Sequence, residues 1–84
     1  MTIYHARVEI RLKPAHVDPE GQTTKKALTD LNYRVEDVFT AKVYEIDLDA
    51  PSLDKAEELV DEMSRKLLAN PVKDDYEFEV REVK

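Results

Sequence analysis

Residues Leu67–Val80 read LLANPVKDDYEFEV, and this stretch ends a helix, makes a turn and begins a strand. Asn70 can adopt the left-handed conformation that closes a helix, and Pro71 cannot continue one. From Tyr76 to Arg81 apolar and charged residues alternate, which is the period of a strand with one buried face. The stretch therefore predicts a helix that ends at this turn and a last strand from about Asp75 to Val83.

A second helix is predicted just upstream of this turn. Ala50-Pro51-Ser52 supplies its start, with Ser52 as the cap. Acidic residues come early in the segment and basic residues late, which suits the helix dipole at both ends. Apolar residues recur at spacings of three and four, as on the buried face of a helix: Leu53, Ala56, Val60, Met63 and Leu67.

The N-terminal half predicts a strand followed by a helix. From Tyr4 to Lys13 apolar and polar residues alternate, and Pro14 ends the strand. Asp18-Pro19-Glu20 is typical of a helix start, and Asn32 is the predicted end. Gly21 in the first turn is unfavourable for a helix and indicates a close backbone approach or a loosely wound start. The predicted inward stripe of this helix consists of Thr24, Ala27, Leu28 and Leu31.

The segment from Tyr33 to Asp49 is predicted to be rich in strand. Its second half alternates cleanly, whereas the spacing of Val35 and Val38 indicates a bulge or turn near residues 37–41. One bent strand and a two-strand hairpin both fit. Together the elements predict an α+β two-layer sandwich over a single domain, residues 1–84. Its antiparallel sheet has three or four strands with two helices on one face, in the ferredoxin-like order β-α-β(-β)-α-β.

Composition narrows the classes of function. The chain has 84 residues, with 13 basic and 19 acidic side chains and a net charge of −6. Nucleic-acid binding needs a basic surface, so nucleic acid and anionic membranes are not expected partners. No apolar run approaches the ~18 residues of a membrane span, and we expect a cytoplasmic protein. With no cysteine to supply disulfides or the usual zinc sites, so short a chain is expected to gain stability by oligomerising.

No set of residues predicts catalysis or metal binding. Ser52 and Ser64 suit structural positions, and the acidic pairs Asp74-Asp75 and Asp47/Asp49 are typical of a solvated face. His5 is predicted on the polar face of the first strand, without a visible orienting partner. His16 lies in a loop where the following helix start offers a weak anion site. We therefore expect no catalytic, metal or cofactor-binding residue in this chain.

Three stretches carry a family resemblance. Residues Lys13–Thr23 centre on VDPEG, Leu28–Lys42 form the middle segment, and Leu67–Tyr76 contain LLANPV, the most specific piece. At this length and in this order, they resemble the small-subunit family (PurS) of phosphoribosylformylglycinamidine synthase. Val17 and Glu20 stand where the family commonly has Leu and Gln, and both replacements conserve shape or lie in exposed positions.

The resemblance implies a role in a complex of purine biosynthesis. That complex makes formylglycinamidine ribonucleotide from formylglycinamide ribonucleotide, glutamine and ATP. A glutaminase subunit releases ammonia, and a large synthetase subunit that uses ATP and Mg consumes it. The small subunit is implied to be a homodimer or a tetramer that bridges the two and assists ammonia transfer, with no catalytic activity or cofactor of its own.

The predicted protein-contact residues lie in two loops. They comprise Lys13, Asp18, Pro19 and Gly21 in the first loop, and Asn70, Pro71, Val72, Asp75 and Tyr76 in the second. Each residue also has a structural interpretation as a cap, a turn or a core residue. The alternative function is a small dimeric module that senses an amino acid or a nucleotide. Close backbone contact with such a ligand needs glycine, and the chain has only one.

Overall fold

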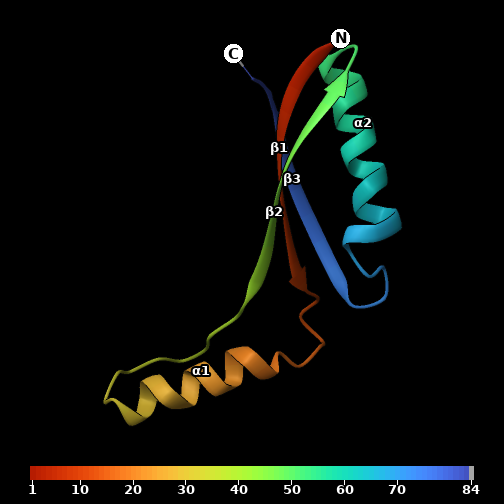
Figure 1. Ribbon diagram of the computed structural model, residues 1–84. Helices are drawn as coiled ribbons and strands as arrows, with labels where there is room; N and C mark the ends of the chain where they lie inside the picture. Colours follow the sequence, from red (N-terminus) through yellow and green to blue (C-terminus); the bar gives the residue numbers. More distant parts are fainter. Residues whose placement is uncertain (84) are drawn as a thin grey trace.

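The computed structural model describes residues 1–83 and shows a narrow antiparallel sheet with one helix packed on it and another projecting away (Figure 1). The elements are β1 (Thr2–Leu12), α1 (Pro19–Asp30), β2 (Ala41–Ala50), α2 (Leu53–Met63), a π-helical turn η1 (Ser64–Leu68) and β3 (Asp74–Glu82). The predicted α+β class and antiparallel sheet are confirmed, and within the described residues the sheet has three strands.

The strand order is β2-β1-β3, and β1 pairs antiparallel with both neighbours. Val8 at the middle of β1 lies opposite Tyr44 of β2 and Phe78 of β3. Because β1 and β2 are adjacent and antiparallel, residues 13–40 form a long excursion from what is otherwise a β-hairpin. We call this excursion the arm; it contains α1.

The core lies between the sheet and α2. One face of β1 presents Tyr4, Ala6, Val8 and Ile10, all buried, and α2 contributes Ala56 and Val60. The alternation predicted for β1 is therefore confirmed, because the opposite face carries polar and charged side chains such as Arg7 and Arg11. A period of two residues places the apolar set on the side that α2 covers.

α2 begins and ends at serine residues. Ser52 caps its start, since the Ser52 Oγ accepts a hydrogen bond of 3.1 Å from Lys55 N. Ser64 is fully buried, and its Oγ donates to Val60 O at 2.8 Å where the helix widens into η1. Back-bonding of a serine to the preceding turn satisfies its hydroxyl inside the core. The structural interpretation of both serines is confirmed.

The first helix lies elsewhere than predicted. Among residues 1–83 α2 is the helix that covers the sheet, whereas α1 projects away from the end of β1 (Figure 1). The predicted stripe is consequently not buried, and Leu31 is 66% exposed. The radius of gyration is 16.6 Å, whereas a compact chain of this length has about 12 Å. The arm is the reason for this difference.

Two details of the turns also differ from the sequence predictions. Asn32, after α1, has the positive φ of 73° that closes a helix, whereas Asn70 does not take this conformation. Asn70 instead forms an Asx turn, because its Oδ1 accepts a hydrogen bond from Val72 N at 2.9 Å. The alternatives left open for residues 33–49 resolve to neither form, since residues 33–40 return along the arm without strand structure and β2 begins at Ala41.

Candidate protein-contact site

The two predicted contact loops meet at one end of the sheet, where β1 ends and β3 begins. Lys13 N donates to Lys73 O at 2.7 Å, and Lys13 Nζ lies 2.8 Å from Asp75 Oδ1. Sixty-two positions separate Lys13 from Asp75 in the chain, so only the pairing of β1 with β3 brings them together. We call this surface, formed by residues 13–18 and 70–75, the loop end.

Asp18 joins the start of α1 to the segment of the arm that returns to β2. Its Oδ1 accepts from Gly21 N at 2.9 Å as the helix cap, and its Oδ2 accepts from Thr40 N and Thr40 Oγ1 at 2.7 and 2.8 Å. These hydrogen bonds, led by that from Gly21, lower the pKa of the Asp18 carboxyl. Pro19 occupies the first helical position, and the predicted helix start is confirmed.

Gly21 is buried because another part of the arm crosses it. A Cβ at this position would lie 2.3 Å from the backbone oxygen of Val38. Real Cβ atoms do not approach backbone that closely, so glycine is needed for the returning leg to pass. The prediction of a close backbone approach is confirmed.

The second loop combines a self-bonded turn with exposed apolar groups. Asn70 N donates to Asp74 Oδ2 at 2.9 Å, and Asp74 N donates to Asn70 O at 2.8 Å. This ring of bonds holds Pro71 and Val72 outward, and Val72 is 74% exposed. Leu67, in the π-helical turn η1, is 83% exposed. The turn is thus held by its own hydrogen bonds while Val72 at its tip is largely exposed, which suits a contact with another protein.

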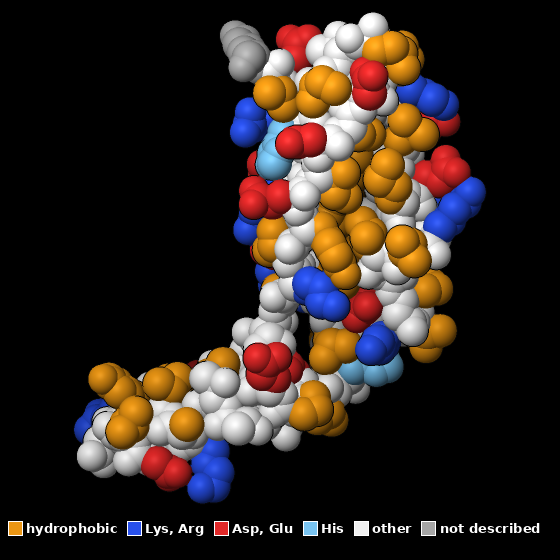
Figure 2. All heavy atoms as spheres, in the orientation of Figure 1, with side chains coloured by type: hydrophobic (Ala, Val, Ile, Leu, Met, Phe, Trp, Pro, Cys, Tyr) orange, Lys and Arg blue, Asp and Glu red, His pale blue; other side chains and the backbone are white. Residues whose placement is uncertain are grey.

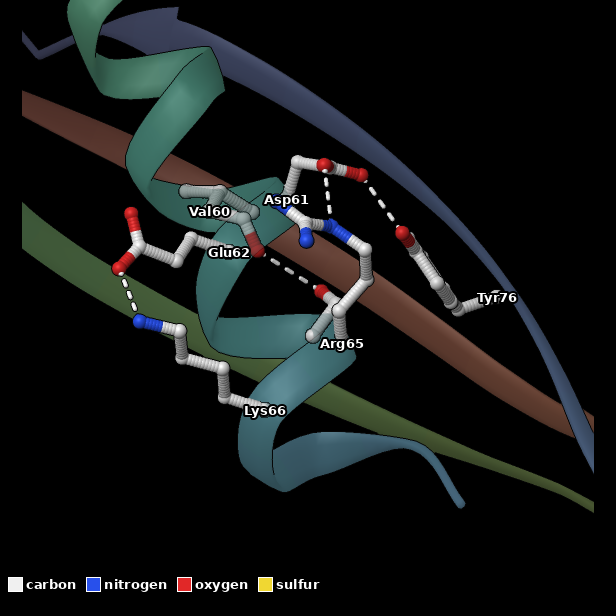
Figure 3. Close-up of polar contacts among 7 residues, drawn as sticks. Val60, Asp61, Glu62, Arg65, Lys66 and Tyr76 are labelled. Carbon is white, nitrogen blue, oxygen red and sulfur yellow. Dashed lines mark hydrogen bonds and ion pairs between the residues drawn. The ribbon is translucent and has the colours of Figure 1, made fainter. Parts of the chain in front are cut away.

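Tyr76 is anchored to α2 by its hydroxyl (Figure 3). The Tyr76 Oη donates to Asp61 Oδ1 at 2.6 Å, and Arg65 Nε donates to Asp61 Oδ2 at 2.8 Å. The Tyr76 bond, followed by the Arg65 bond, lowers the pKa of Asp61, and the same contact raises the pKa of Tyr76. Tyr76 therefore fixes the start of β3 against α2, and its ring stacks near Phe78 with centroids 6.4 Å apart.

The lowered pKa of Asp61 predicts a specific acid sensitivity. A carboxyl whose pKa is lower in the folded state stabilises that state above its unfolded pKa of about 3.9, and loses this contribution as the pH falls through the folded pKa. At pH 7, Asp61→Asn is expected to melt several degrees below the unmodified chain. The difference in melting temperature between the two proteins should become smaller as the pH is lowered below about 4.

Thermal melts from pH 7 to pH 2 check this expectation, with Tyr76→Phe as the companion variant. Tyr76→Phe removes the main donor to Asp61, so its melting temperature should follow the same convergence with the unmodified chain. A gap for Asp61→Asn that stays constant over the whole pH range would contradict the assignment.

The two histidines lie in different surroundings. His5 Nδ1 lies 2.7 Å from Asp47 Oδ1 across the β1–β2 pair, so the orienting partner that the sequence did not reveal is Asp47. His16 lines an open hollow of about 280 Å³ between the end of β1 and the base of the arm, beside Arg11 and Phe39. Within residues 1–83 no group of side chains is arranged to hold a metal ion.

Some residues of this site could not be found from sequence reasoning. Thr40 binds Asp18 from 22 positions away, and no local pattern marks it. For Asp61 the sequence contains a weak indication, because a tyrosine on the inward face of a strand requires a polar partner for its hydroxyl. In the described part of the chain no helix is both long and apolar enough to cross a membrane.

Comparisons with known proteins agree on one family. The family model described as PurS, phosphoribosylformylglycinamidine (FGAM) synthase, matches residues 5–82. The PurS subunit of Archaeoglobus fulgidus FGAM synthase is 49% identical over 78 residues, covering 92% of this chain and 98% of the relative. Its counterpart in Methanocaldococcus jannaschii is 42% identical over 82 residues, covering 96% of this chain and 99% of the relative.

Solved structures agree over nearly the full length. Thermus thermophilus PurS superposes with a TM-score of 0.87 at 40% identity, covering 98% of this chain and 99% of that one. A chain in the structure of PurLQS from Thermotoga maritima gives 0.84 at 27% identity, covering 99% and 100%. The arm is roughly a third of the chain, so such scores require it to superpose together with the sheet. The chain therefore belongs to the PurS family of phosphoribosylformylglycinamidine synthase.

Proposed function

We propose that this chain is the non-catalytic bridging subunit of a cytoplasmic FGAM synthase complex. In this role it links the glutaminase subunit to the ATP-dependent synthetase subunit and assists ammonia transfer by holding the two together. ATP and Mg are used by the synthetase, and this chain binds no cofactor. The chain acts as a homodimer or a tetramer, because so short a chain without cysteine gains stability by oligomerising.

The observation that carries the proposal is the loop end. Two loops distant in sequence are joined there by the Lys13–Asp75 contact, and the turn at Asn70 presents Val72 to solvent. A rigid turn with an apolar tip and a polar rim has the composition of a protein-contact site. We assign Lys13, Pro71, Val72 and Asp75 to direct contact with a partner subunit.

The other predicted contact residues hold the loops of this surface in position. Asp18 and Gly21 shape the base of the arm, Asn70 holds the turn, and Tyr76 anchors β3 to α2. Pro19 begins α1 beside them. Substitutions at these positions are expected to act on the partner contact through the shape of the loops.

Reconstitution tests the function. The chain is mixed with the glutaminase and synthetase subunits, and product formation supported by glutamine is measured together with assembly by size-exclusion chromatography. We expect that omission of the chain abolishes both. If neither the glutamine-supported rate nor assembly depends on the chain, the bridging role is wrong.

The substitution Val72→Asp tests whether the loop end is the surface that contacts a partner subunit. We expect at least a tenfold weaker assembly, because a carboxylate at the apolar tip must lose its hydration when the partner covers it. The melting temperature should not change, since Val72 is exposed. The control is Val83→Asp, at the far end of the sheet next to Ile3. Equal assembly by both variants would remove the loop end from the interface.

A further inference from the structure

The hollow at the base of the arm combines basic side chains with an aromatic ring. It has a volume of about 280 Å³, and its walls come from the end of β1, the start of the arm and the returning leg. Its basic side chains are Arg11, Lys13 and His16, and its aromatic side chain is Phe39. In Figure 2 basic side chains and a histidine lie where the arm meets the body of the molecule. The chain has a net charge of −6, so this basic hollow is where its surface attracts a small anion.

The cations of the hollow have more hydrogen-bond donors than their ion pairs use. A guanidinium carries five N–H donors and an ammonium three. In the described chain Arg11 donates through Nη2 to Glu9, and Lys13 Nζ lies 2.8 Å from Asp75 Oδ1. The walls formed by residues 1–83 include neither Glu9 nor Asp75. Exposed ion pairs of this kind contribute little energy, so the remaining donors can bond an anion inside the hollow.

The start of α1 does not provide the anion-binding groups. Asp18 Oδ1 accepts from Gly21 N, and Pro19 at the first helical position has no N–H. The anion position expected at this helix start is thus filled by the Asp18 carboxylate itself. Asp18 is also a wall residue, but its Oδ2 accepts two bonds from Thr40. A ligand in the hollow must therefore be held by the basic side chains.

We propose that this hollow binds a nucleoside monophosphate, with its phosphate between Arg11, Lys13 and His16 and its base against Phe39. Charge-assisted hydrogen bonds from arginine and lysine are the usual contacts to phosphate. Phe39 is 79% exposed, and an exposed aromatic ring beside cations offers a stacking surface for a base. The volume is close to the lower end of the ~300–1,000 Å³ of small-molecule sites. The acidic remainder of the chain opposes a polymer of phosphates, so a single nucleotide is the ligand that fits.

The first test compares three ligands that differ in one group each. The unmodified chain, in its own oligomeric state, is titrated with adenosine monophosphate, ribose 5-phosphate or adenosine, and amide chemical shifts are followed. We expect a Kd of about 1 mM or lower for adenosine monophosphate. Ribose 5-phosphate should bind about fivefold more weakly or worse, because it lacks the base, and adenosine about tenfold more weakly or worse, because it lacks the charge. The shifts should concentrate in residues 11–18 and 39–41.

Two results of this titration would overturn the proposal. Adenosine that binds as tightly as adenosine monophosphate would show that the phosphate is not recognised. Ribose 5-phosphate that binds as tightly as adenosine monophosphate would show that the base is not recognised, and the nucleotide would be the wrong ligand. Absence of any shift, or shifts outside these two segments, contradicts the site itself.

The second test compares two arginines of the same strand. Arg11 and Arg7 both pair with Glu9, and their side chains are 56% and 51% exposed, so neither substitution disturbs the core. Among the described residues Arg11 lines the hollow and Arg7 does not. We expect Arg11→Gln to bind adenosine monophosphate at least tenfold more weakly and Arg7→Gln to bind it like the unmodified chain. Equal affinities of the two variants would refute the site.

Phe39→Ala tests the stacking contact separately. We expect it to weaken adenosine monophosphate about fivefold or more and to leave ribose 5-phosphate unchanged, because the second ligand has no base to lose. The exposed position of Phe39 means that the variant should fold and melt like the unmodified chain. A Phe39→Ala chain that binds adenosine monophosphate with full affinity would remove Phe39 from the site.

The competing occupant of the hollow is a carboxylate of a partner subunit. In that case the chain alone would not bind adenosine monophosphate, and Arg11→Gln would instead weaken assembly with the glutaminase and the synthetase. This result overturns the ligand site and leaves the bridging role. Binding of adenosine monophosphate by a chain that has no effect in reconstitution leaves the ligand site and removes the bridging role.

Discussion

Val60→Asp is expected to unfold the chain at room temperature. Val60 is fully buried on α2 and packs with Val8 and Ile10 of β1 in the main core cluster. An aspartate there is either ionised without a partner or forced to take up a proton, and either state costs several kcal/mol. A domain of this size has a stability of only about 5 kcal/mol, so the substitution removes most or all of it.

Circular dichroism and thermal melting check this expectation. Val60→Ala, which removes two buried methyl groups, should stay folded but lose about 2 kcal/mol. Leu67→Asp introduces the same carboxylate at an exposed position of η1 and should melt like the unmodified chain. A cooperative melt for Val60→Asp close to that of Leu67→Asp would show that α2 is not the cover of the sheet.

Gly21→Ala is expected to open the base of the arm. The added Cβ would lie 2.3 Å from Val38 O and 3.0 Å from the Asp18 carboxyl, so the returning leg must move. Overpacking of this kind costs about 1–3 kcal/mol. Because Asp18 bonds both the start of α1 and the returning segment of the arm, the displacement should also loosen its bonds to Thr40.

The direction in which Gly21→Ala shifts the melting temperature tests this expectation. In a helix without steric conflict, Gly→Ala stabilises by about 1 kcal/mol, so propensity alone predicts a higher melting temperature. We expect a lower one, together with amide chemical-shift changes in the arm and few in β3. The control is Gln22→Ala, at the next position in α1, which is exposed and should be neutral. A raised melting temperature for Gly21→Ala would refute the crossing of the two legs.

Local patterns predicted the elements where neighbours in sequence decide the structure. Asp18 and Ser52 cap their helices as expected, because a cap requires only its own side chain and the backbone three residues on. The two asparagines show the limit of this reasoning. Asn32 takes the left-handed conformation, whereas Asn70 does not, since Asp74 and Val72 provide its turn with other hydrogen bonds.

The proposed contact site is partly predicted from the sequence. The motifs indicate the two loops, and the structure brings Lys13 against Asp75 through the pairing of β1 with β3. Thr40 and Asp61 were not predicted, because their partners lie 22 and 15 positions away in the chain. Which loop residues face outward depends on these distant contacts, so the sequence could name the loops but not their exposed tip.

The sequence by itself determined the α+β class, the buried face of β1 and the family, because periodicity, caps and motifs depend on neighbouring residues. Only the tertiary structure decided where α1 lies. An amphipathic stripe such as Leu28 and Leu31 requires an apolar surface but does not specify which one. In this chain α2 packs on the sheet, while the arm, joined at its base by Asp18 and Thr40, carries α1 away from that sheet (Figure 1).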